Sequence, residues 1–202
     1  MRVRLGNRAA AGLFGLALGC AALAPNLAHA SEADLHYAIC LSHKKANKFE
    51  DAERECKLAL AKNPEHASAL YTLGTLQRQK GQLEAALSSF HKVTELEPQS
   101  SLGWAGEGSV LLRLNRAEDA IMPLKRAIAL DPEDTGSVAN LGNALRKAGK
   151  TDEAIAMYRK ALEKDKDNPD LLNNLSVALR AQRNNTEAVK ASERAVLIRP
   201  DD

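Results

Sequence analysis

Aromatic residues are scarce in this chain of 202 residues, where Phe, Tyr and Trp together make up 3%. The strands of β-sandwiches and β-barrels favour aromatic and β-branched residues, so the composition disfavours both folds. Only three cysteines are present, which excludes a scaffold held by many disulfides. The charges nearly balance, because 28 Lys and Arg residues face 26 Asp and Glu residues and leave a net charge of +2. So small an excess is not typical of a nucleic-acid-binding protein.

The first thirty residues resemble a secretory signal peptide. They begin with three basic residues, Arg2, Arg4 and Arg8. Residues 9–24 carry no charge, and the small residues of an Ala-His-Ala sequence that ends at Ala30 are typical of a cleavage site. We expect cleavage after Ala30 and a periplasmic or secreted protein. Two alternatives are an uncleaved anchor, for which the run is short against the ~20 residues of a membrane span, and a lipoprotein cut before Cys20.

Cleavage would also change the charge of the protein. The removed segment holds three arginines and no acidic residue, which leaves 25 basic residues against 26 acidic ones. Any basic character of the mature chain is therefore local.

The rest of the chain repeats with a period of 34 residues. Prolines mark this period at 64, 98 and 132, and Pro200 falls on it two periods later. The period divides the chain into five units, 33–66, 67–100, 101–134, 135–168 and 169–202. We number each unit from 1 to 34, so that these prolines occupy position 32. Position 20 is then Ala in every unit, and position 8 is always small: Cys40, Gly74, Gly108, Gly142 and Ser176.

The spacing within each unit predicts two helices. Positions 4, 7, 8 and 11 lie on one face of a first helix, and positions 20, 24 and 27 lie on one face of a second. Turn signals such as Lys80-Gly81 separate the two helices. A single hairpin cannot bury its own apolar face, so the units must stack into a continuous core.

These residues resemble the tetratricopeptide repeat. The second unit matches its pattern at Leu73-Gly74, Ala86, Phe90 and Pro98, and the third and fourth units match at Gly108, Ala120, Pro132, Leu141-Gly142, Ala154 and Tyr158. The resemblance implies an all-α fold, a right-handed α-solenoid of five helix-turn-helix repeats over residues 31–202. It also implies a non-enzymatic scaffold that binds a client protein or peptide in a concave groove. With export, it suggests a role in assembling a cell-envelope or exported complex.

The resemblance places the groove at positions 2, 5, 6, 9, 12 and 13 of the first helices. The candidate contacts are Tyr37, Tyr71, Asn140, Asn143, Arg146, Asn174 and Arg180. Every unit also has a basic residue at position 12 or 13, which would suit an acidic client. The alternative is an ordinary solvated helix face.

Two cysteines oppose each other in the first unit. Cys40 is at position 8 and Cys56 at position 24, which face each other across an antiparallel hairpin. In an exported protein this arrangement predicts a disulfide. The alternatives are two buried thiols, or a metal- or redox-linked protein that uses the two cysteines with His36 and His43. We expect no cofactor, and we expect His66 and His91 to be solvated.

The third unit departs from the pattern. Glu107 stands at position 7, where the other units have Leu or Ile, and Pro123 falls within the second helix. Three glycines, at 103, 106 and 108, would loosen the first helix. We expect a bend or soft spot here, with a local accommodation as the alternative.

The last helix carries an apolar edge at Val189, Val196 and Ile198. In earlier units the equivalent residues would meet a following unit. This edge could therefore dock on a partner or on a second copy of the chain.

No catalytic pattern is visible in the sequence. We find no Ser-His-Asp arrangement, no glycine-rich phosphate loop and no paired carboxylates in a plausible cleft. Repeat packing explains the short motifs, and we expect no enzyme activity.

Overall fold

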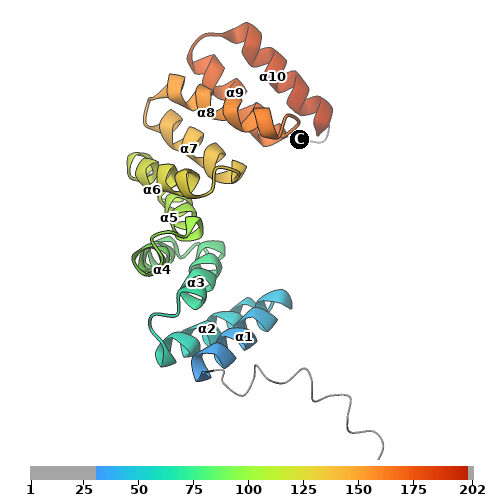
Figure 1. The fold of residues 1–202 in the computed structure, drawn as a ribbon. Helices are drawn as coiled ribbons and strands as arrows, with labels where there is room; N and C mark the ends of the chain where they lie inside the picture. The colour runs from blue at the N-terminus through green and yellow to red at the C-terminus, as the bar shows by residue number, and fades with distance from the viewer. Residues whose placement is uncertain (1–30, 200–202) are drawn as a thin grey trace, which may run out of the picture.

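The computed structural model describes residues 31–199, and within this range it contains ten α-helices and no strand. Each predicted unit forms one helical hairpin, and the five hairpins stack along a curved axis (Figure 1). The helices are α1 (Glu32–Lys45), α2 (Phe49–Lys62), α3 (Ala67–Gln79), α4 (Leu83–Leu96), α5 (Ser101–Arg113), α6 (Ala117–Leu130), α7 (Thr135–Lys147), α8 (Thr151–Lys164), α9 (Pro169–Ala181) and α10 (Asn185–Ile198).

Local sequence explains where these helices begin and end. Ser31 caps α1 through a capping box with Asp34, and the side chain of Asn168 accepts from the backbone N–H of Leu171 at the start of α9. The second helices α4 and α6 end immediately before the residue that precedes a proline, where helical backbone is disfavoured. Capping side chains and prolines therefore determine where these helices begin and end.

Every hairpin turn has a residue with positive φ at position 15. Glycine supplies it in the second and fourth units, at Gly81 and Gly149, and Asn47, Asn115 and Arg183 supply it in the others. Glycine and asparagine adopt this left-handed backbone at little cost, whereas arginine is less suited to it.

Within the first four hairpins, the small residue at position 8 lies against the residue at position 24. A Cβ added to Gly108 would lie 2.5 Å from Leu124 Cγ, and one added to Gly142 would lie 2.5 Å from Tyr158 Cε1. Such distances leave no room for a side chain, so glycine lets the two helices approach closely. In the first hairpin, the same two positions hold Cys40 and Cys56, which form the predicted disulfide with Cα atoms 5.3 Å apart.

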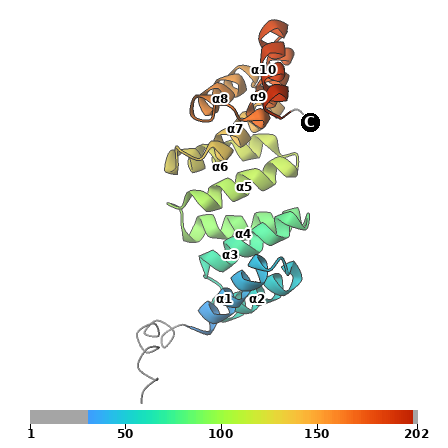
Figure 2. The ribbon, with the colours of Figure 1, turned by 90° about the vertical axis from the view of Figure 1, so that its right-hand side faces the viewer.

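Neighbouring hairpins stack through the second helix of one unit and the first helix of the next. The pairs α2–α3, α4–α5, α6–α7 and α8–α9 are all in contact, and Figure 2 shows the resulting layers. The odd-numbered helices α3, α5, α7 and α9 also contact one another in sequence. They therefore line the inner side of the curve, and the even-numbered helices lie outside.

The glycines of the third unit have a role that the sequence interpretation missed. A Cβ on Gly106 would lie 2.5 Å from Phe90 Cδ1, and one on Gly103 would lie 2.9 Å from Val93 Cγ1. Both glycines thus bring α5 close to α4 of the preceding unit. Helix α6 also continues through Pro123. A soft spot in this unit stays a prediction, for hydrogen exchange to test.

We predict that Gly106→Ala lowers the free energy of unfolding by about 1–3 kcal/mol, because the added methyl group overpacks the buried ring of Phe90. Gly136→Ala is the matched control. Its Cβ would meet only the flexible carboxylate of Asp134, at 3.0 Å, and alanine favours helix. Urea unfolding followed by circular dichroism measures both variants. Equal stabilities would contradict the close contact of α4 and α5.

Candidate functional site

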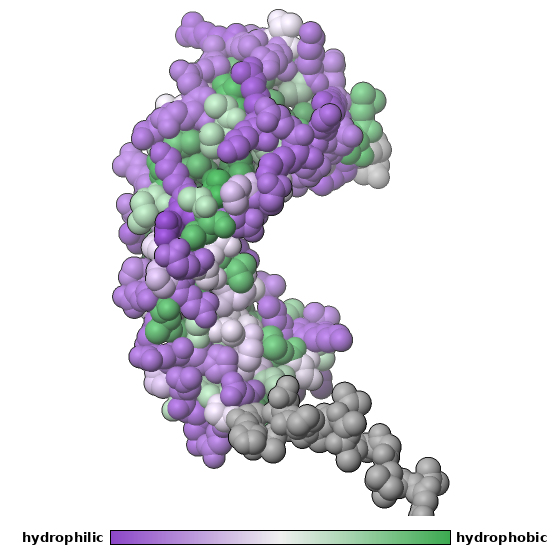
Figure 3. All heavy atoms as spheres, viewed as in Figure 1, coloured by the Kyte–Doolittle hydropathy of each residue, from purple (hydrophilic) through white to green (hydrophobic). Residues whose placement is uncertain are grey.

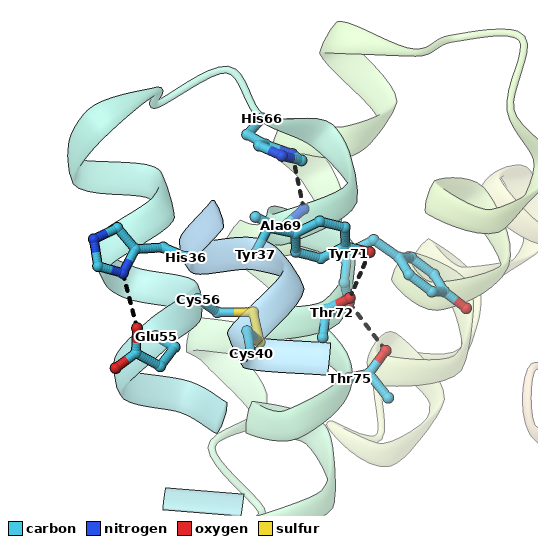
Figure 4. The surroundings of a disulfide bond; sticks show 10 residues. All are labelled: His36, Tyr37, Cys40, Glu55, Cys56, His66, Ala69, Tyr71, Thr72 and Thr75. Atoms are coloured by element: carbon cyan, nitrogen blue, oxygen red, sulfur yellow. Dashed lines mark hydrogen bonds and ion pairs between the residues drawn. A yellow bond between two sulfur atoms is a disulfide. The ribbon is translucent and has the colours of Figure 1, made fainter. Parts of the chain in front are cut away.

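The inner side of the curve contains a hollow of about 350 Å³ between α1, the first turns of α3 and α5, and the C-terminal end of α4. Its lining includes Tyr37, Leu41, Lys44, Tyr71, Thr72 and Leu102. The hydroxyl of Tyr37 lies 3.4 Å from Thr72 Oγ1, and Figure 4 shows the two side chains pointing toward each other. The sequence thus predicted both tyrosines of this hollow.

A second hollow, of about 190 Å³, continues the first one along the inner side. It lies between α3, α5 and α7 and includes Arg78, Ser109 and Asn140 in its lining. Tyr71 and Leu102 line both hollows, so the two form one groove. Leu102 was not among the predicted contacts, although a leucine at position 2 was a usable signal, since the other units have Asp, Ser or Gly there. Figure 3 shows the bowed surface from the side.

Two other predicted contacts surround the hydroxyl of Tyr158 in the fourth unit. This hydroxyl donates to Asn143 Oδ1 over 2.8 Å. Burial raises the pKa of Tyr158, and its hydrogen bond with the Arg146 side chain opposes that effect. The Nε of Arg146 is buried and has no hydrogen-bond partner. Asn143 and Arg146 are therefore tied to the interior of their own hairpin.

The remaining predicted contacts lie on α9, away from both hollows. Asn174 is half-buried there and Arg180 is exposed. The structure therefore brings Tyr37, Tyr71 and Asn140 together in one groove, but it does not bring Asn174 and Arg180 to the same place.

The basic row at positions 12 and 13 takes part in stacking. Arg78 Nη1 donates to Ser109 Oγ over 2.9 Å, and Arg113 Nη1 donates to the carbonyl of Arg78 over 2.5 Å. The second contact adds a side-chain donor to a carbonyl in the last turn of α3, which also accepts from the backbone N–H of Gly81 over 3.2 Å. Lys147 Nζ likewise reaches Asn115 Oδ1 of the preceding unit, at 3.1 Å. Much of this row links neighbouring units.

The histidine and cysteine cluster of the first hairpin is occupied by internal contacts. Both sulfur atoms belong to the disulfide, and His36 Nδ1 lies 2.8 Å from Glu55 Oε2. Among residues 31–199, no group of three or more His, Cys, Asp or Glu side chains is placed to hold a metal ion. Thiolates are the form of cysteine that binds metal, so the metal-linked alternative lacks its two sulfur ligands in this structure.

His66 is not solvated, contrary to our expectation. Its side chain is 13% exposed, and Nδ1 accepts from the backbone N–H of Ala69 over 3.3 Å, which caps α3. Its ring also packs on Tyr37, with centroids 4.8 Å apart (Figure 4). Histidine is not among the residues that usually cap helices, so this cap was hard to predict. His66 therefore positions Tyr37 in the groove.

The apolar edge of α10 is exposed, as the sequence predicted. Val189, Val196 and Ile198 are 49%, 52% and 38% exposed. Self-association through this edge stays a prediction, which light scattering at high protein concentration tests.

Family models for the tetratricopeptide repeat (TPR) match residues 43–109 and 140–202. The chain belongs to the TPR family. This membership supports a scaffold for protein–protein interaction. No helix among the described residues is long and apolar enough to cross a membrane.

Solved TPR structures share this fold. MamA from Desulfovibrio magneticus RS-1 is 21% identical, with a TM-score of 0.79 over 86% of this chain and 98% of that one. YrrB, described as a TPR protein with an unusual peptide-binding site, is 25% identical, with a TM-score of 0.74 over 84% of this chain and 88% of that one. These likenesses confirm an all-α helical repeat solenoid.

A curated relative matches a smaller part of the chain. FK506-binding protein 59 of Drosophila melanogaster is 34% identical over 85 residues, and the match covers 39% of this chain and 19% of that protein. The chain thus spans less than a fifth of that relative's length.

We predict that replacing both cysteines, Cys40→Ala with Cys56→Ala, lowers the free energy of unfolding by about 3 kcal/mol, because the bond closes a 16-residue separation. Thermal unfolding measures the loss. Reduction in denaturant followed by refolding should destabilise the wild-type chain and leave the double variant unchanged. A wild-type chain that is unaffected by reduction would show that the disulfide adds no stability.

Proposed function

We propose that this TPR protein is a non-enzymatic scaffold that binds an extended segment of a client protein in its inner groove. The binding centre is the place where the two hollows meet, at Tyr71 and Leu102. The observation that carries this proposal is that both residues line both hollows. A single apolar side chain of a client could therefore anchor there while the flanking residues extend into each hollow.

Exposed apolar surface and fixed aromatic rings support this use of the groove. Leu102 is 54% exposed and Leu41 is 40% exposed. Covering these apolar side chains with a client would be favourable, because it removes apolar surface from water. Tyr71 packs edge-on against Phe90, with centroids 5.7 Å apart, and His66 supports Tyr37. Rings that are already held in place bind a ligand with little further loss of conformational entropy. The peptide-binding site described for YrrB supports a peptide as the ligand.

The charge of the groove limits the kind of client. Because Arg78 and Arg113 make contacts within the chain, we assign the contact for an acidic client residue to Lys44, which lines the first hollow. Glu97 lines the same hollow and would repel a second carboxylate. We infer a client segment with an apolar anchor and one acidic residue, and not an acidic run.

We also propose that the protein acts outside the cytoplasm, in the assembly of a cell-envelope or exported complex. Two observations support this: the signal-peptide pattern of residues 1–30, which lie outside the described residues, and a disulfide, which oxidising compartments favour. N-terminal sequencing of protein from its native cells should begin at Ser31. A lipid on Cys20 would indicate the lipoprotein alternative, and an unprocessed N-terminus would contradict export.

We predict that a photo-crosslinking amino acid in place of Leu102 captures one main client in intact cells. The same amino acid in place of Leu58 is the control, since Leu58 is 39% exposed on α2 and lies outside both hollows. Mass spectrometry then identifies the client segment. For that segment, Leu102→Ser should weaken binding at least tenfold, about 1.4 kcal/mol, and Leu58→Ser should not. Capture that is equal at both positions would exclude the groove as the binding site.

A further inference from the structure

The outer side of the solenoid contains a cavity of about 440 Å³ between α4 and α6. Its lining includes Leu87 and His91 from α4, Met122 and Pro123 from α6, and Glu107 and Leu111 from α5. The volume is typical of pockets that bind small ligands or single side chains. The cavity lies on the opposite side of α5 from the groove that Leu102 lines.

Glu107 is the unusual residue of this cavity. The equivalent position 7 is apolar in the other four units, at Ile39, Leu73, Leu141 and Leu175. The side chain of Glu107 is only 13% exposed, and its two oxygens have long contacts of 3.4 Å, one to Thr94 Oγ1 and one to His91 Nδ1. In the part of the chain that the structure describes, no lysine or arginine pairs with it. A largely buried carboxylate with only two long contacts lowers the stability of the fold. Residues that break the packing pattern in this way are expected at functional sites.

The charges around the cavity favour a cation. Glu84 and Asp119 line it together with Glu107, and its one arginine, Arg116, is already paired with Asp119 at 2.8 Å. The carboxylates of the cavity lining therefore outnumber its basic side chains. The lining thus has an apolar part, with Leu87 and Leu111, and an acidic part. An aliphatic chain that ends in a cation fits both, because its methylene groups can pack on the leucines while its charged end reaches a carboxylate.

We propose that this cavity is a second protein-binding site, which takes a lysine or arginine side chain of a partner while an adjacent apolar residue of the partner covers Met122. Met122 is 62% exposed at the rim, which leaves apolar surface for such a neighbour. This site is independent of the inner groove, so the chain can hold two protein segments on opposite sides of its third unit.

Binding of two short peptides to the ¹⁵N-labelled chain tests this proposal. The probe is acetyl-leucyl-lysyl-leucine amide, and the control peptide has norleucine, which lacks the charge, in place of lysine. We expect saturable shifts of the Glu107, Leu111 and Met122 amides with the lysine peptide, and at least tenfold weaker binding of the norleucine peptide. Equal binding of the two peptides, or shifts confined to the inner groove, would overturn the proposal.

Two variants show whether Glu107 is responsible. Glu107→Gln removes the charge and should weaken binding of the lysine peptide at least tenfold, whereas Glu163→Gln makes the same change at an exposed position on α8 and should have no effect. Glu107→Leu restores the residue type of the other units, so it should abolish binding and unfold at an equal or higher urea concentration. A lower urea midpoint, or unchanged binding in Glu107→Gln, would show instead that Glu107 serves only the contacts with Thr94 and His91.

Discussion

The contact between positions 8 and 24, seen in the first four hairpins, is the constraint on which the rest of the structure depends. It sets how closely two antiparallel helices approach, and this spacing fixes the shape that each hairpin presents to the next. Glycine at position 8 leaves room for a bulky side chain of the second helix, as at Gly74, Gly108 and Gly142. Cys40 instead forms a covalent bond with the residue at position 24. The first hairpin, which has a described neighbour on one side only, thus has the strongest form of a contact that recurs along the chain.

Helix α5 shows how packing and binding share a single element. Leu102 faces the inner groove, Gly103 and Gly106 lie against α4, and Glu107 lines the outer cavity. Because Gly103 and Gly106 let α5 lie close to α4, and Gly108 lets it lie close to α6, α5 is held on both sides while Leu102 and Glu107 line the two sites. The departures of the third unit from the repeat pattern therefore coincide with both proposed binding sites.

The repeat period and helical spacing were sufficient to predict the hairpins and the facing pair Cys40 and Cys56, because these features follow from residues within one unit. That the hairpins stack followed from the apolar face that a single hairpin cannot bury. Contacts between units were harder to predict. The hydrogen bond from Arg113 to the carbonyl of Arg78 and the close approach at Gly106 both depend on where a neighbouring unit lies. Position numbers identified Tyr37, Tyr71 and Asn140 as groove residues, but could not show that Asn143 points to Tyr158. Spacing assigns a residue to a face and leaves its partners undetermined.

The fifth hairpin allows the most direct test of the central constraint, since it has serine at both positions, Ser176 and Ser192. If positions 8 and 24 face each other in every unit, the double variant Ser176→Cys with Ser192→Cys should form a second disulfide under the conditions that oxidise Cys40 and Cys56. Intact mass spectrometry should then show the loss of four hydrogens relative to the fully reduced chain. A loss of only two, with both new thiols free to react with an alkylating agent, would contradict the account.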